Sequence, residues 1–316
     1  MTSERKLLLL ALPFAALACG NYSNEDLEFM NALPQGSELR AQMPEVSPAL
    51  APADEAELAA MTHKTTRDFN GLLAGLVSIV DLVRSLPPSA RTTDSRTWGP
   101  FPPDQTQLRN RDWWTRMIMR RDLDNPQQFD YEISVHKIGN GALDWPVLIR
   151  GWFLAGQTAR KGNGHVELVT ADARAEGMDL TDLGMLDHLE IDYDTAADPL
   201  WVAMTVTSLP APGSADPPPM LVYTYKANAA GQGQMTFDLY ANLVAGPAIE
   251  DLNVTARWLP TGAGRAQATI VSGDGQGSQQ TECWDSSFRR TYDIKPWNPA
   301  DDFGGDPSVC VDIPAL

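Results

Sequence analysis

The chain has 316 residues, of which 43% are hydrophobic and 21% are charged, a composition typical of a globular protein with a full core. Its formal net charge is −17 at pH 7, and no basic patch interrupts the acidic balance. Because such a surface repels phosphate groups, we exclude nucleic acid as a partner.

The segment 7–19 reads LLLLALPFAALAC and follows Arg5 and Lys6. A basic start, an apolar run and small residues at its end are typical of a secretory signal. The apolar run of about 11 residues is shorter than the roughly 20 that a membrane-spanning helix needs. The last four residues, ALAC, resemble the lipobox of bacterial lipoproteins, in which signal peptidase cuts before the cysteine and the thiol carries a diacylglycerol.

This resemblance implies that residues 1–18 are a signal peptide and that Cys19 carries a lipid that attaches the protein to a membrane. Gly20 follows, where an aspartate would indicate retention at the inner membrane, so the resemblance implies the outer membrane. The alternative is a plain secretory signal with an incidental cysteine.

Residues 19–52 are predicted to be a tether. Ser23 and Asp26 can cap a short helix, which Pro34 would end. The prolines that follow lie among Ser, Ala and Gln, a composition that favours an extended, semi-rigid spacer between the membrane and a domain over 53–316.

One long helix is predicted at the start of this domain. Asp54 and Glu57 have the spacing of a capping box, and apolar residues then recur at the helical period as far as Leu86, before two prolines. Gly71 and Gly75 would let another backbone approach this helix closely.

From Trp98 onward the apolar period changes to two, which indicates strands with one buried face. About 11 strands are expected on this pattern, and they lie at 113–119, 131–135, 147–155, 165–173, 189–193, 201–208, 221–226, 235–243, 252–258, 266–272 and 284–292. A helix is expected at 178–186.

The connections between these strands are short and rich in Gly and Asn, and such links join antiparallel neighbours. The sequence therefore predicts a mainly β fold, in which an antiparallel meander forms a curved half-barrel or a barrel covered by one long N-terminal helix. A two-sheet sandwich is the alternative.

Three cysteines are present, and with Cys19 assigned to lipid, Cys283 and Cys310 remain. In an exported protein these two thiols are predicted to form one disulfide. A metal site on either cysteine is disfavoured, because no CxxC motif or histidine pair lies nearby.

No catalytic or cofactor-binding motif occurs, and no two of the four histidines, His63, His136, His165 and His188, have metal-ligand spacing. No catalytic residue and no cofactor is therefore predicted. Two acidic loops are weak calcium candidates, because carboxylates near flexible backbone suit Ca²⁺, although turn chemistry explains them equally well. Their residues are Asp192, Asp194, Asp198, Asp301, Asp302 and Asp306.

A second resemblance lies at the two ends of the mature chain. The start at 19–27, CGNYSNEDL, and the C-terminal stretches RWLPTGAGRA (257–266), ECWDSSFRR (282–290) and GDPSVC (305–310) are similar to uncharacterised lipoproteins of myxobacteria. The resemblance implies a lipoprotein family without an assigned activity.

Three functions follow as hypotheses. The first is a non-enzymatic, lipid-anchored envelope lipoprotein that acts as a scaffold or interaction module. The second is a carrier of a lipid or other hydrophobic ligand between the helix and the curved sheet, and this rests on architectural analogy. The third is a hydrolase or carbohydrate-binding protein with a dispersed site.

Overall fold

The structure is a computed structural model that describes residues 22–45, 55–102, 112–139, 145–180, 185–209, 220–244 and 248–316, without the side chains of 82–84. The predicted lipid attachment site, Cys19, and the predicted helix cap, Asp54, lie outside these described residues.

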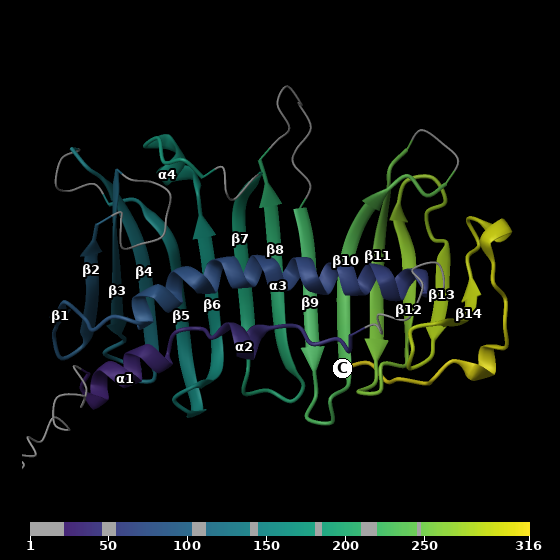
Figure 1. The fold of residues 1–316 in the computed structure, drawn as a ribbon, viewed down its shortest axis with the longest axis horizontal. Coiled ribbons are helices and arrows are strands. Elements are labelled where there is room, and N and C mark those ends of the chain that lie inside the picture. The colour runs from purple at the N-terminus through teal and green to yellow at the C-terminus, as the bar shows by residue number, and fades with distance from the viewer. Residues whose placement is uncertain are drawn as a thin grey trace, which may run out of the picture.

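Within the described residues, fourteen strands form a single antiparallel sheet whose spatial order follows the chain from β1 to β14 (Figure 1). The first seven strands are β1 (Ala90–Arg91), β2 (Ser95–Phe101), β3 (Trp113–Arg121), β4 (Gln128–Lys137), β5 (Val147–Thr158), β6 (Lys161–Val169) and β7 (Leu186–Asp194). The other seven are β8 (Leu200–Ser208), β9 (Met220–Ala227), β10 (Gly233–Ala241), β11 (Glu250–Trp258), β12 (Gly264–Ser272), β13 (Gln279–Trp284) and β14 (Arg290–Ile294).

The antiparallel meander predicted from the short connections is confirmed. β1 and β14 are edge strands that do not pair with one another, so the sheet is open. A closed barrel and a two-sheet sandwich are therefore wrong. The predicted strand at 284–292 is two strands, because Asp285 accepts hydrogen bonds from the backbone amides of Ser287 and Arg289 and so forms a turn between β13 and β14.

The described helices are α1 (Asn24–Asn31), α2 (Gly36–Leu39), α3 (Glu57–Arg84) and α4 (Ala171–Ala175), with 3₁₀ turns η4 (Pro299–Asp301) and η5 (Pro307–Val309). The prediction of a single long N-terminal helix is wrong, since α1 and α2 precede α3. Residues 181–184 of the helix predicted at 178–186 lie outside the described residues; of the rest, 178–180 are not helical and Leu186 begins β7. None of the described helices is long and apolar enough to cross a membrane.

Alternate residues of the strands form an apolar face, here called the inner face. In β11, Leu252, Val254, Ala256 and Trp258 are buried on it, whereas the alternate residues Asn253, Thr255 and Arg257 are partly exposed on the opposite, outer face. Helix α3 crosses the strands of the inner face (Figure 1), and Phe69 and Val80 are fully buried. The space between α3 and the strands is thus occupied by side chains of one hydrophobic core.

The N-terminal segment 22–45 runs alongside α3 on the same face of the sheet (Figure 1). Phe29, Leu33 and Leu39 are at most 2% exposed and belong to the core. The Asn70 side chain of α3 both donates to and accepts from the backbone of Ala41, each at 2.9 Å. This part of the predicted tether is therefore packed against the domain and does not act as a spacer.

Helix α1 is held by a buried acid. Asp26 and Ser23 form a reciprocal capping box, as the sequence indicated. The Asp26 carboxylate, 0% exposed, also accepts from Nε of Arg96 at 2.5 Å and of Arg91 at 3.1 Å. Burial alone would raise the pKa of Asp26, but the hydrogen bonds from Ser23, Arg96 and Arg91 outweigh it and lower the pKa to about 2.

Glycines lie opposite aromatic residues at several cross-strand positions of the inner face. Gly164 of β6 pairs with Tyr193 of β7, and Gly233 of β10 pairs with Trp258 of β11. A Cβ added at either glycine would overlap the phenol or the indole ring, so the ring lies directly on the backbone of the neighbouring strand. Gly71 of α3 differs, because nothing lies within 4 Å of an added Cβ, and the close backbone approach predicted there is wrong.

We predict opposite effects of alanine at these two kinds of glycine. Gly164→Ala should lower the free energy of unfolding by about 1–3 kcal/mol, because its methyl group overpacks against Tyr193. Gly71→Ala should raise it by up to about 1 kcal/mol, because alanine restricts the unfolded chain and meets open space in the helix. Urea unfolding measures both, and equal effects would contradict the packing described here.

Candidate functional site

The N-terminus of α3 meets a buried carboxylate from the other end of the chain. Glu282 of β13, 0% exposed, accepts hydrogen bonds from the backbone amides of Glu57 at 2.8 Å and Leu58 at 2.5 Å. A carboxylate in this position satisfies amides that have no partner within the helix and complements the helix dipole. Lys295 donates to the Glu57 side chain at 2.8 Å and so adds a second link between α3 and the C-terminal strands.

Burial raises the pKa of the Glu282 carboxyl to about 7, against the lowering effect of the two amides that donate to it. The negative charges of Asp293 and Glu57 add to the rise. Burial also raises the pKa of Asp293, which accepts from Gln280 at 3.0 Å. Glu282 anchors the N-terminus of α3 and Asp293 joins β14 to β13, so we assign both acids a structural role.

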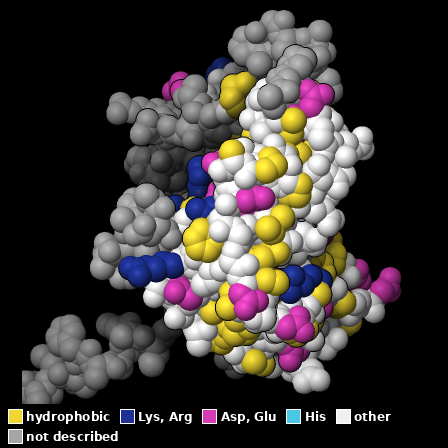
Figure 2. All heavy atoms as spheres, turned by 90° about the vertical axis from the view of Figure 1, so that its right-hand side faces the viewer, with side chains coloured by type: hydrophobic (Ala, Val, Ile, Leu, Met, Phe, Trp, Pro, Cys, Tyr) yellow, Lys and Arg dark blue, Asp and Glu magenta, His cyan; other side chains and the backbone are white. Residues whose placement is uncertain are grey.

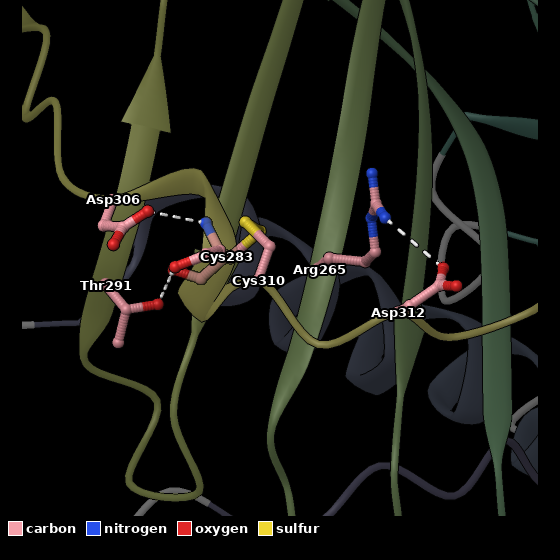
Figure 3. Close-up of a disulfide and its surroundings, with 7 residues drawn as sticks. Arg265, Cys283, Thr291, Asp306, Cys310 and Asp312 are labelled. Carbon is pink, nitrogen blue, oxygen red and sulfur yellow. Dashed lines mark hydrogen bonds and ion pairs between the residues drawn. A yellow bond between two sulfur atoms is a disulfide. The ribbon is translucent and has the colours of Figure 1, made fainter.

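The predicted disulfide between Cys283 and Cys310 is present (Figure 3). Cys283 is on β13, and Cys310 follows η5 after 27 residues of sequence. Closing a loop of this size contributes about 3 kcal/mol in the chain-entropy model. Near the bond, Thr291 donates to the Cys283 carbonyl at 3.1 Å and Arg265 pairs with Asp312 at 4.0 Å.

The tail after the disulfide crosses the outer face, on the side of the strands away from α3 (Figure 3). Four hydrogen bonds join it to outer-face residues: Arg257 to the Ile313 carbonyl, Gln232 to the Pro314 carbonyl, Lys226 to the Leu316 carbonyl, and the Leu316 amide to Gln234. Figure 3 and these contacts place the tail as a strap across β9–β13, which the disulfide fixes at one end.

The first loop of calcium candidates is built from turn and strand contacts. Asp194 accepts from the amides of Ala196 at 2.8 Å and Ala197 at 3.0 Å. Asp198 accepts from the amide of Ala229, and Asp192 pairs with His165 across β6 and β7 at 2.8 Å. These three carboxylates each have local partners and do not converge on one point.

The second acidic loop is similar. Asp302 accepts from the Lys295 amide at 2.5 Å, Asp306 accepts from the Ser308 amide at 2.9 Å, and Asp301 accepts from Asn298. Figure 2, which faces this end of the molecule, shows Asp and Glu side chains spread over the surface. No three of the six candidates bring ligand atoms together in the described chain, so turn chemistry explains both loops.

The structure instead groups Glu167 of β6 with His188 and Glu190 of β7 on the outer face, here called the histidine patch. His188 Nε2 lies 3.0 Å from Glu190 Oε1 and 3.6 Å from Glu167 Oε1. All three residues are partly exposed. Imidazole and carboxylates at these distances are ligands that Zn²⁺ accepts.

Glu167 already has a strong partner, however. Arg150 of β5 binds both of its carboxylate oxygens, and this ion pair lowers the pKa of Glu167. A metal ion would have to displace or tolerate the guanidinium, so the patch is primarily an ion-pair network. Sequence reasoning missed it because the residues come from two paired strands, and their register cannot be read from spacing along the chain.

A groove of about 740 Å³ lies between α3 and residues 36–45. Arg40, Arg67 and Met43 are among its lining residues, so both charged and apolar groups face it. His63 borders it and makes hydrogen bonds to Glu55 at 3.0 Å and to the Pro44 carbonyl at 2.9 Å. The volume is that of a small-molecule site. No motif indicated this groove, because residues 36–45 belong to the segment that was predicted to be a tether.

No family model, curated protein or solved structure matches this chain. The assignment of function therefore depends on the residues themselves.

We predict a pH-dependent stability that comes from Glu282. The unfolded carboxyl loses its proton near pH 4.5 and the folded one near pH 7, so the folded state loses stability as pH rises between these values. The shift corresponds to up to about 3 kcal/mol at 1.4 kcal/mol per pH unit. The difference in unfolding free energy between the wild type and Glu282→Gln, from urea titrations, should fall across this window.

Glu45→Gln is the matched control, because it removes the same charge from an exposed position. Its difference from the wild type should show no comparable fall. A flat Glu282→Gln difference between pH 4.5 and 7 would contradict a protonated, buried cap.

Proposed function

We propose that the protein is a lipid-anchored lipoprotein of the outer membrane that acts without catalysis, as a scaffold or interaction module. The observation that carries the proposal is the filled inner face. The chain's own α3 and residues 22–45 cover the apolar side of the sheet, and their side chains form one core with the strands. On the outer face, the strands outside β9–β13, where the C-terminal strap lies, are left for partners.

The outer face suits polar contacts. On it, Arg120 of β3 pairs with Glu132 of β4 and Arg150 of β5 pairs with Glu167 of β6. Beside them, His188 hydrogen-bonds Glu190 within β7. Interfaces of transient partners are about as polar as the rest of a protein surface, and charged pairs set their specificity. A broad, charged sheet surface of this kind supports an interaction role better than a catalytic one.

The carrier of a hydrophobic ligand is the second candidate, and the groove between α3 and residues 36–45 is the observation that favours it. The ligand would lie beside α3, and not between α3 and the sheet, where Phe69, Leu73 and Val77 pack into the core. A dispersed-site hydrolase or sugar-binding protein has no comparable support among the described contacts.

The anchoring part of the proposal is tested with radioactive palmitate in the native host. The full chain should incorporate label and sediment with membranes, whereas Cys19→Ser should do neither, because the thiol that carries the diacylglycerol is gone. Cys283→Ser together with Cys310→Ser is the matched control, since it removes two thiols but leaves the lipobox. Equal labelling of the wild type and Cys19→Ser would overturn the proposal.

A further inference from the structure

We propose that the α1 end of the sheet rests directly on the bilayer, with Leu27 of α1 and Leu123 of the β3–β4 turn in the headgroup layer. The inference rests on the proposed lipid anchor at Cys19. It assigns a membrane-binding surface to this end of the molecule and an orientation to the whole domain.

The chain between Cys19 and α1 is short. Three peptide bonds separate Cys19 from Tyr22, the first described residue. A chain reaches at most about 3.6 Å per residue, so Tyr22 lies within about 11 Å of the acylated cysteine. The polar layer on each side of a bilayer is about 5–8 Å thick. The start of α1 therefore cannot be far from the membrane surface.

Helix α1 is fixed to the sheet and cannot serve as a spacer. Asp26 is bound to Arg96 at 2.5 Å, and Glu28 pairs with Arg121 of β3 at 2.5 Å. Phe29 packs edge-on against Phe129 of β4, with ring centroids 5.1 Å apart. Because these contacts join α1 to β2, β3 and β4, a membrane that holds Cys19 also holds this end of the sheet.

The surface at this end of the molecule carries two exposed leucines. Leu27 is 46% exposed and Leu123 is 80% exposed, both large apolar side chains without cover. They lie at the same end of the molecule, because Arg121, two residues before Leu123, is bound to the α1 residue that follows Leu27. Exposed apolar side chains beside a lipid anchor add buried apolar area to the membrane contact.

The orientation follows from the order of the strands. Neighbouring strands lie about 4.8 Å apart, so β14 is about 60 Å from β1 along the sheet. The disulfide is at the β13–β14 end, away from α1, and the C-terminal strap runs from it back as far as β9 (Figure 1). This end and the tail across β9–β13 would face away from the membrane.

The test uses the full, acylated chain in vesicles of phosphatidylethanolamine and phosphatidylglycerol. A single cysteine is introduced as Leu123→Cys and labelled with the environment-sensitive dye NBD. The dye labels this cysteine, because Cys19 carries lipid in the proposed anchor and Cys283 and Cys310 are bonded to each other. Val271→Cys, at a 41% exposed apolar position of β12, is the matched control.

The dye at position 123 should shift to shorter wavelength, brighten several-fold and be quenched by spin-labelled lipid, whereas the dye at position 271 should emit as in water. The mass of the purified chain is measured first. A chain without acyl groups would overturn the proposed anchor and this inference with it. If the chain is acylated but the dye at position 123 emits as in water, like the dye at position 271, the inference is overturned and the proposed anchor is not.

Discussion

A single open sheet has one apolar face that must be kept from water, and the rest of this structure depends on how that face is covered. α3 alone is one helix lying across a sheet of 14 strands. Residues 22–45 lie beside it and bury Phe29, Leu33 and Leu39 in the same core. Apolar burial contributes about 25 cal/mol per Å². The packing of α3 and residues 22–45 on the sheet is therefore the main source of stability besides the contacts between the strands.

Two buried acids fix the cover at opposite ends of the sheet, and they do so in different charge states. Asp26 at the α1 end is surrounded by donors, and its hydrogen bonds with Ser23, Arg96 and Arg91 hold the pKa near 2. Glu282 at the β13 end is buried with other acids nearby, and its pKa rises to about 7. The contacts of Asp26 are therefore insensitive to pH over the neutral range, whereas those of Glu282 depend on pH.

The sequence was sufficient for features that depend on local periodicity. The alternation around Tyr131 and Leu252 located β4 and β11, and the helical period located α3. It was not sufficient where partners are distant: the α3 amides are capped by Glu282, and His188 meets Glu167 only through strand register. Residues 22–45 were misjudged because proline-rich composition indicates an extended chain but does not reveal that the chain is packed.

The most direct test of this account is native-state hydrogen exchange of the intact protein across residues 22–45. The account predicts that the Ala41 amide, which donates to Asn70, and the α1 amides exchange slowly, with opening free energies close to those of the core strands. Fast exchange throughout 22–45, with slow exchange confined to the strands and α3, would show that this segment is a tether and would contradict the account.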